Sequence, residues 1–177
     1  MSNMEGIEKN GLINVLIEIS IGSSIKYEYD EKTGRLIVDR FLHTSMHYPF
    51  NYGFIPRTIS EDGDPVDVLV LTLESIYPGT ILPTRIIGML ATEDEHGRDI
   101  KLVGVPNDSI DPESYKIQNI LDLSQPTKDR IVHFFEYYKS LEKGKWVKIK
   151  KWHGKDEAVN YLQKCFEKFS QSQEKEI

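Results

Sequence analysis

The sequence is short of cysteine, of long apolar runs and of positive charge, and each shortage excludes a class of protein. Its 177 residues contain one cysteine, Cys165, so no disulfide can form within the chain and a reducing compartment is expected. The longest apolar runs have the length of a strand, far below the roughly 20 residues of a membrane-spanning helix. The early acid Glu5 and the lack of an apolar leader argue against a secretory signal. We therefore expect a soluble, cytoplasmic protein.

Basic residues are outnumbered by acidic ones, 22 against 28, and the formal net charge is −6 at pH 7. A protein that binds nucleic acid usually carries a positive excess that engages phosphates, so this balance argues against that class. Hydrophobic residues make up 39% of the chain and charged residues 28%, as in ordinary globular proteins. With no internal repeat or low-complexity linker, this length predicts a single domain over residues 1–177.

Short apolar segments separated by Gly, Pro and Asp predict a chain dominated by strands. A buried strand is expected at residues 12–19. A hairpin is expected over residues 24–40, where Ile25, Tyr27 and Tyr29 alternate with charged residues. Further strands are expected at residues 66–73, 85–91, 99–105 and 145–150. Such a series of short strands indicates a small barrel or a strongly bent sheet.

Two helices are expected late in the chain. Apolar residues recur at helical spacing between residues 128 and 143, a stripe that includes Leu141, and Gly144 follows as a stop signal. A final helix is expected to include residues 158–169. The polar residues 170–177 are expected to fray.

The strongest chemical signal is the acidic hexapeptide Asp62–Asp67, which reads DGDPVD. Its carboxylates repel one another if they share a site without cations, and oxygen ligands with no nearby His or Cys favour Mg²⁺, Mn²⁺ or Ca²⁺ over Zn²⁺. Taken alone, the hexapeptide is equally compatible with a solvated acidic turn. An EF-hand loop is excluded, because a loop starting at Asp62 would place Asp67 where glycine is required and Leu73 where glutamate belongs.

A second acidic group lies within residues 93–101. If a strand begins at Asp99, then Asp99 and Lys101 project from one face, and by the same rule Lys26 and Glu28 share a face of the earlier hairpin. Two strands that each present a carboxylate beside a lysine suit a site for both metal and anion. Each pair alone is better explained as surface salt bridging, so only their combination predicts function.

A series of short blocks along the chain has a recognisable order and spacing. The blocks are Ile17-Glu18-Ile19, Lys26-Tyr27-Glu28, Asp39-Arg40, Tyr48–Phe54, Asp62–Asp67, Asp94-Glu95, Asp99–Lys101 and Phe134–Lys139. Together they resemble the family I soluble inorganic pyrophosphatases in their short bacterial form, from Glu18 to Trp152. One departure is Ser20, which stands where the family usually has a proline and leaves the catalytic groups unchanged.

The resemblance implies an α+β fold with an OB-type five-stranded β-barrel core and flanking helices. It implies an inorganic diphosphatase that hydrolyses pyrophosphate to two phosphates, uses several Mg²⁺ ions per site with Mn²⁺ as a substitute, and assembles as a homohexamer. The implied metal ligands are Asp62, Asp67, Asp94, Asp99, Glu18 and Glu28. The implied phosphate contacts are Lys26, Arg40, Tyr52, Lys101, Tyr138 and Lys139. Asp64 is the implied general base, and Tyr48 has a secondary role.

These residue types suit the hydrolysis of a highly charged anion. The site residues implied by the resemblance include seven carboxylates and four cations. The site would therefore repel pyrophosphate unless divalent cations bound as well. The mechanism that follows is direct attack by a metal-activated water with no phosphoenzyme, and Asp64 accepts the proton of that water.

Two other functions compete with this one. An OB-type barrel that binds single-stranded nucleic acid needs a basic groove with stacking aromatics. Here the aromatics of residues 48–54 are followed closely by three aspartates, which would repel a phosphate backbone. A metal-dependent hydrolase of another diphosphate, or of a nucleoside triphosphate, keeps the chemistry and changes the substrate. No glycine-rich phosphate loop supports a nucleotide, and comparing the hydrolysis of pyrophosphate and ATP separates these two.

Overall fold

The structure is a computed structural model that describes residues 12–175. Its strands are β1 (Leu12–Ile19), β2 (Ile25–Asp30), β3 (Arg35–Phe41), β4 (Asn51–Ile55), β5 (Val66–Val70), β6 (Ile81–Asp94), β7 (Gly97–Pro106) and β8 (Val147–His153). Its helices are α1 (Gln125–Tyr137) and α2 (Lys155–Glu174), with short 3-10 turns at Pro112–Lys116 and Ile120–Asp122. None of the helices in residues 12–175 is long and apolar enough to cross a membrane.

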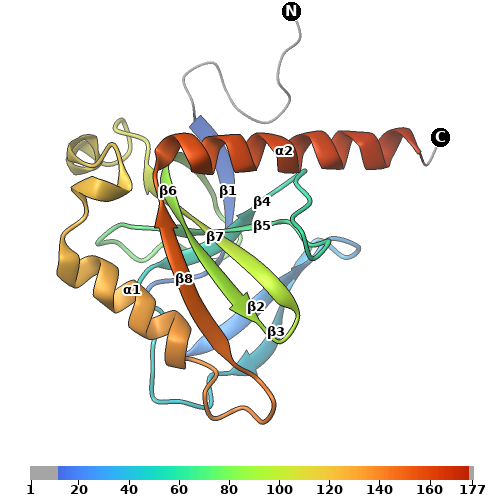
Figure 1. Cartoon of the computed structure of the whole chain (residues 1–177), viewed down its shortest axis with the longest axis vertical. Coiled ribbons are helices and arrows are strands. Elements are labelled where there is room, and N and C mark those ends of the chain that lie inside the picture. The colour runs from blue at the N-terminus through green and yellow to red at the C-terminus, as the bar shows by residue number, and fades with distance from the viewer. Residues whose placement is uncertain (1–11, 176–177) are drawn as a thin grey trace, which may run out of the picture.

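A single sheet curls into a closed barrel at the centre of the molecule (Figure 1). The strand order is β1-β4-β5-β7-β6-β8, and β1 pairs with β6 as well as with β4. This second pairing joins β1, β4, β5, β7 and β6 into a ring, with β8 added at the edge. The long strand β6 bends through register shifts between Ile86 and Gly88 and between Ala91 and Thr92, which lets it pair with three neighbours. The predicted five-stranded barrel is therefore observed.

The tight curl of the barrel depends on glycine at position 53. Gly53 lies in β4 opposite Ile17 of β1. A Cβ atom built there would lie 1.9 Å from the carbonyl oxygen of Leu16. Only glycine allows the two backbones to approach this closely. The strand β1 that is held in this way carries Glu18 near its end.

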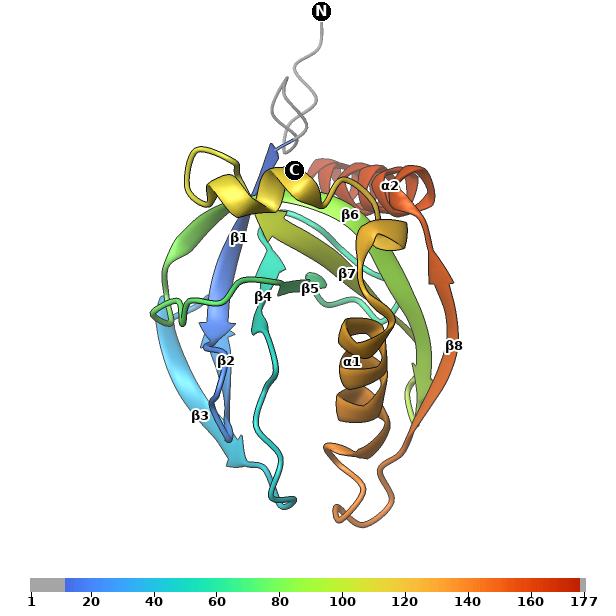
Figure 2. The same ribbon diagram turned by 90° about the vertical axis from the view of Figure 1, so that its left-hand side faces the viewer.

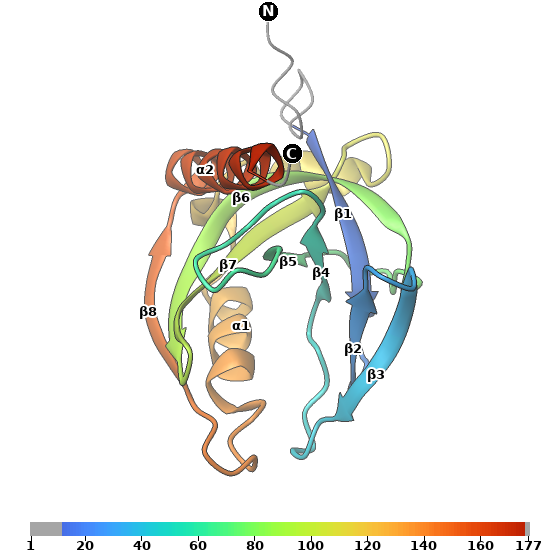
Figure 3. The same cartoon turned by 90° about the vertical axis from the view of Figure 1, so that its right-hand side faces the viewer.

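The hairpin β2–β3 forms a separate two-stranded sheet. It extends from the end of β1, and Figures 2 and 3 show it on the side of the barrel opposite α1. The register pairs Lys26 with Arg40 and Glu28 with Ile37, so the hairpin predicted for residues 24–40 is confirmed. Its charged side chains form one wall of the candidate site.

The two helices cover different parts of the barrel. In α1, which begins after the capping hydroxyl of Ser124, the buried residues Ile131, Phe134 and Phe135 join a core cluster rich in aromatic side chains. The buried face of α2 joins the second core cluster through residues that include Leu162 and Cys165. Each helix thus closes one face of the sheet, and α1 supplies the aromatic floor of the site.

Several predicted boundaries are wrong. Helix α1 ends at Tyr137 rather than near residue 143, and Leu141 is exposed instead of on the apolar stripe. The chain leaves the helix there because it forms tight turns in which the N–H of Glu142 donates to the carbonyl of Lys139. Helix α2 continues to Glu174, beyond the residue where fraying was expected.

Two of the differences between the predicted and the observed structure concern strands. The strand expected at residues 66–73 ends at Val70, and Leu73 is fully exposed in the following loop. Strand β4 was not predicted at all. All five of its residues are buried, so it lacks the polar alternation that marks a half-exposed strand.

Candidate active site

A cavity of about 640 Å³ opens between the hairpin β2–β3, the acidic turn before β5, and the end of α1. Every residue that the sequence singled out lines it: Glu18, Lys26, Glu28, Arg40, Tyr48, Tyr52, Asp62, Asp64, Asp67, Asp94, Asp99, Lys101, Tyr138 and Lys139. Glu95 and Lys145 line it too. In all, ten carboxylates and six Lys or Arg side chains border the cavity. The formal excess of four negative charges favours cations in the cavity.

The acidic turn presents its carboxylates through a local network. The side chain of Ser60 donates to a carboxylate oxygen of Asp62, and the N–H of Asp64 donates to the same oxygen at 3.0 Å. The N–H of Ser60 donates to the carbonyl of Asp64 at 2.8 Å, which closes the turn. Burial, together with the neighbouring carboxylates of Asp62 and Asp67, raises the pKa of Asp64 above its usual value.

Lys101 lies at the centre of the carboxylate cluster and is almost completely buried. Its Nζ donates to the hydroxyl of Tyr52 at 2.8 Å and to Asp67 at 2.5 Å, and it lies 2.9 Å from Asp99. Burial disfavours the ammonium charge, but these carboxylates outweigh it and raise the pKa of Lys101. Burial raises the pKa of Asp99 despite this neighbour. Lys101 therefore neutralises part of a cluster that is otherwise costly to keep charged.

The hairpin side of the cavity combines a buried acid with an exposed charge network. Glu18 accepts a hydrogen bond from the N–H of Tyr29 at 2.8 Å. Burial nevertheless raises the pKa of Glu18 to about 7. Lys26 donates to Glu28, which confirms that these two residues share a face, and also to Asp39 at 3.3 Å.

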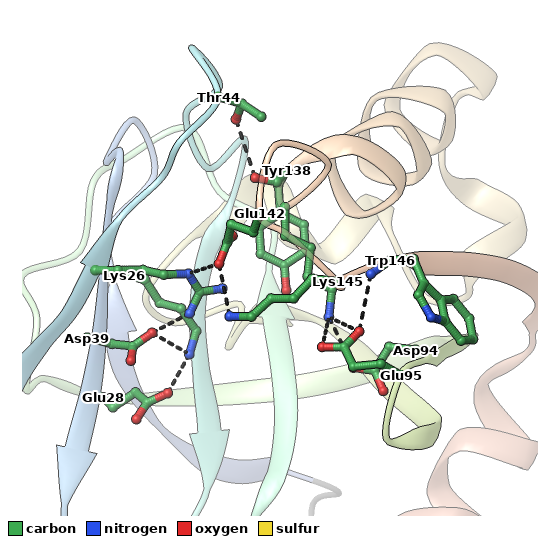
Figure 4. A network of polar contacts seen from close by, with 12 residues as sticks. Lys26, Glu28, Asp39, Thr44, Asp94, Glu95, Tyr138, Glu142, Lys145 and Trp146 are labelled. Atoms are coloured by element: carbon green, nitrogen blue, oxygen red, sulfur yellow. Dashed lines mark hydrogen bonds and ion pairs between the residues drawn. The ribbon is translucent and has the colours of Figure 1, made fainter.

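The opposite side of the cavity holds Lys139 between two acids. Its Nζ donates to Asp94 and to Glu95, each at 3.2 Å. Glu95 also accepts from the backbone N–H of Trp146 at 3.2 Å. Figure 4 shows Asp94, Glu95 and Trp146 together at this edge of the network. Glu95 was part of a recognised block but was assigned no role from the sequence.

Glu142 was missed by the sequence analysis. Its carboxylate is 2.8 Å from Nε of Arg40 and accepts a hydrogen bond from Lys145 at 2.9 Å. The three-residue spacing of Glu142 and Lys145 was the available signal, because side chains so spaced are neighbours in a helical turn. This pair was not recognised because a regular helix was expected to end at residue 143, before Lys145.

Three tyrosines form part of an aromatic cluster beneath the charged groups. The ring of Tyr48 lies 4.6 Å from that of Phe134, and the ring of Tyr138 stacks on Phe134 at 5.0 Å. Burial raises the pKa of Tyr48 and of Tyr52 well above the usual value. Both hydroxyls therefore stay protonated and are available as neutral hydrogen-bond donors.

Helix α2 also reaches the acidic turn, which the sequence did not indicate. The N–H of Ile59 donates to the carbonyl of Cys165 at 3.1 Å, and Lys168 donates to the carbonyl of Ser60 at 2.5 Å. The thiol of Cys165 is buried. Helix α2 lines no part of the cavity among the described residues, so its contribution is to support the turn.

The donor set fits hard divalent metal ions. The ligands on offer are carboxylate oxygens, which Mg²⁺, Mn²⁺ and Ca²⁺ prefer over softer metals. Within residues 12–175, no three acidic, His or Cys side chains converge closely enough to form a ready metal-binding group. Lys101 lies between Asp67 and Asp99, and the remaining carboxylates repel one another. Burial disfavours the charged forms of Glu18 and Asp99 and raises their pKa values. A bound cation would therefore stabilise the charged forms of these two carboxylates.

The fold and the cavity define a barrel protein whose charged cavity suits metal ions together with a small anion. The comparisons with known proteins identify its family. A family model described as inorganic pyrophosphatase matches residues 15–170. The chain therefore belongs to the inorganic pyrophosphatase family, and to its bacterial-type family I branch. This family depends on metal ions.

Relatives and solved structures agree with this assignment. The chain is 54% identical over 162 residues to the inorganic pyrophosphatase of Sulfolobus acidocaldarius, covering 92% of this chain and 94% of that protein. It is 51% identical over 157 residues to that of Aquifex pyrophilus, covering 89% of each chain. The structure of the Helicobacter pylori inorganic pyrophosphatase superimposes with a TM-score of 0.91 at 44% identity, covering 96% of this chain and 99% of the other. These likenesses confirm the predicted α+β barrel fold.

Proposed function

We propose that the chain hydrolyses pyrophosphate by direct attack of water in the carboxylate-lined cavity, without a phosphoenzyme. Hydrolysis of pyrophosphate to two phosphates is the reaction of its family, and the family match supports neither a nucleic-acid module nor another substrate. The observation that carries the assignment of this cavity is that carboxylates and cations from separate elements converge on it. The steps and residue roles below are inferred from that arrangement.

The proposed metal ligands are Asp62, Asp67, Asp94 and Asp99, with Glu18 and Glu28 holding further ions directly or through water. Bound divalent ions would neutralise the phosphate oxygens and lower the pKa of the attacking water. Mg²⁺ is the proposed physiological ion and Mn²⁺ the substitute, because both accept a shell of carboxylate and water oxygens.

Asp64 is the proposed general base. It lies in the acidic turn between two proposed ligands, and its raised pKa makes it a better proton acceptor than an ordinary aspartate. The N–H of Asp64 donates to Asp62, so the backbone of Asp64 is held close to that proposed ligand. It takes the proton of the attacking water as the new P–O bond forms.

The cations and tyrosines are proposed to bind the phosphate groups. Arg40, Lys139 and the hydroxyls of Tyr52 and Tyr138 would hold the leaving phosphate, while Lys26 and Lys101 add positive charge around the phosphate groups. Hydrogen bonds from charged donors to phosphate oxygens are among the strongest in proteins. They stabilise the charge that builds on the leaving oxygen. Tyr48 has a secondary, packing role beneath these groups.

The setting proposed for this enzyme is the cytoplasm, as a homohexamer of one domain over residues 1–177. The likeness to the Sulfolobus acidocaldarius relative runs over 92% of this chain, which supports a single domain over these residues. Large apolar side chains that stay exposed, such as Phe41 and Tyr77, offer surface for contacts between copies. Light scattering on the purified chain measures the oligomer directly, and a monomer at working concentration would rule the hexamer out.

The function is tested by phosphate release from pyrophosphate, first with Mg²⁺ and then with excess chelator. We expect rapid release that the chelator abolishes and fresh Mg²⁺ restores. ATP under the same conditions is the substrate control, and we expect much slower release from it. If folded protein releases no phosphate from pyrophosphate with Mg²⁺ or Mn²⁺, the proposal is wrong.

A further inference from the structure

Glu142 is a buried carboxylate that contacts two cations of the active-site cavity. Only 7% of the residue is exposed, and the same oxygen faces both partners, Nε of Arg40 at 2.8 Å and Nζ of Lys145 at 2.9 Å. Arg40 and Lys145 line the cavity. Figure 4 shows Glu142, which belongs to the segment that follows α1, in the middle of the polar network.

The contact joins two walls of the cavity that come from separate parts of the chain. Arg40 lies on β3, in the sheet formed by the hairpin alone. Glu142 and Lys145 lie in the turn between α1 and β8. A long hydrogen bond, 3.4 Å from the hydroxyl of Thr44 to the carbonyl of Tyr138, also runs between the segment after β3 and the end of α1. The ion pair of Arg40 with Glu142 therefore helps to set the position of the hairpin wall relative to α1.

The charges around Arg40 fix its orientation. Its Nη1 contacts Asp39, on the same strand, while Nε faces Glu142 from the opposite wall. Nε makes no hydrogen bond within the described residues, so ion-pair contacts on two sides, rather than a bidentate hydrogen bond, restrict the rotation of the planar guanidinium. Burial disfavours its charge, but Glu142 and Asp39 outweigh burial and raise the pKa of Arg40. Glu142 also offsets the repulsion between Arg40 and Lys145, which would otherwise push the two cations apart.

We propose that Glu142 is a positioning residue that holds Arg40 and Lys145 in the arrangement that binds a phosphate group of pyrophosphate. It does not line the cavity in the described part of the chain, so it acts through these cations rather than on the substrate. The inference rests on the proposed phosphate-binding role of Arg40. It adds Glu142, from the turn after α1, to the residues on which phosphate binding depends. Phosphate binding then also depends on the contact between this turn and the hairpin β2–β3.

The first test is Glu142→Gln, which keeps the size of the side chain and removes its charge. We expect kcat/KM for pyrophosphate to fall roughly tenfold, mainly through a higher KM, because a binding cation displaced by a fraction of an ångström loses much of its effect. The matched control is Glu113→Gln. Glu113 pairs with Lys116 at the same three-residue spacing but on the exposed surface, so its kinetics should equal those of the wild type.

A double-mutant cycle with Arg40→Gln separates positioning from general weakening of the fold. We expect Arg40→Gln to raise KM, and Glu142→Gln to add much less in that background than in the wild type, because most of its effect passes through Arg40 and only the remainder through Lys145. The double variant leaves neither member of the pair with an unpaired charge, which keeps the test usable if Glu142→Gln alone is unstable. If the effects of the two substitutions on KM are additive, the inference is wrong. It is also wrong if folded Glu142→Gln has a normal KM while Arg40→Gln has a raised one. In both cases the proposed function is unaffected. A normal KM in Arg40→Gln overturns the proposed role of Arg40 and the inference with it.

Discussion

At the scale of single residues, the cavity is a balance between carboxylates that repel one another and a few cations that hold them. Lys101 contacts both Asp67 and Asp99, so it keeps two proposed ligands from separating. Burial raises the pKa values of Asp64 and Asp99 because their charged forms are poorly solvated. The same burial gives Asp64 the basicity that a proton acceptor needs.

Replacing Asp64 with Asn tests its role as the base. The amide has nearly the same shape but cannot accept a proton, so we expect kcat to fall by about 10²–10⁴-fold. Steady-state phosphate release at several pH values gives the answer. Asp129→Asn is the control, because Asp129 is an exposed residue of α1 that bonds Gln125. Full activity of Asp64→Asn at every pH would exclude this residue as the base.

At the scale of the elements, the site depends on strands that are brought unusually close. Glu18 lies on β1, Asp67 on β5 and Lys101 on β7. The parallel register of β5 and β7 places Val68 beside Leu102, so Asp67 and Lys101, one residue before each, are neighbours too. Helix α2 supports the acidic turn from outside the cavity through Cys165.

Gly53→Ala tests the close approach of β1 and β4. The added methyl group would meet the carbonyl oxygen of Leu16 at 1.9 Å, and backbone atoms have little room to move away. We expect the free energy of unfolding to drop by about 3 kcal/mol or more, measured by denaturant titration. Gly154→Ala is the control, since a methyl group there meets nothing closer than 3.7 Å. Equal stability of the two variants would show that the barrel tolerates a wider strand separation.

At the scale of the whole molecule, the negative excess of the chain is concentrated where metal ions would bind. The formal net charge is −6, and the cavity alone carries an excess of four acids over basic side chains. Ions that bind the folded state and ignore the unfolded chain stabilise the fold by mass action. We therefore expect metal binding and folding stability to be coupled in this protein.

Removal of metal should lower the melting temperature. At a free Mg²⁺ concentration about 100 times the dissociation constant, one site adds about 2.7 kcal/mol, which for a chain of this size is a shift of roughly 5–10 °C. Calorimetry with Mg²⁺ and with chelator measures the shift. KCl at matched ionic strength is the control for simple screening. An unchanged melting temperature would contradict the proposed metal site.

Local patterns in the sequence predicted most of the strands, the hairpin and the acidic turn, while site residues such as Glu18, Arg40 and Lys139 came only from the family resemblance. The alternation around Tyr27 and the turn at residues 31–34 depend on neighbours in the chain, and the acidic hexapeptide Asp62–Asp67 carries its chemistry in its own composition. The family resemblance added the fold and the reaction, which the comparisons support. These features are visible in sequence because each is set within a few residues.

Only the tertiary structure decided how distant segments meet. The pairing of Glu142 with Arg40 joins residues about a hundred positions apart, and α1 ends at Tyr137, short of the residue at which the sequence predicted its end. The contact of α2 with the acidic turn, and the fully buried β4, also have no local signal. Such features follow from packing and from the pairing of buried charges, and these are settled by the partners that folding brings together rather than by the order of neighbouring residues.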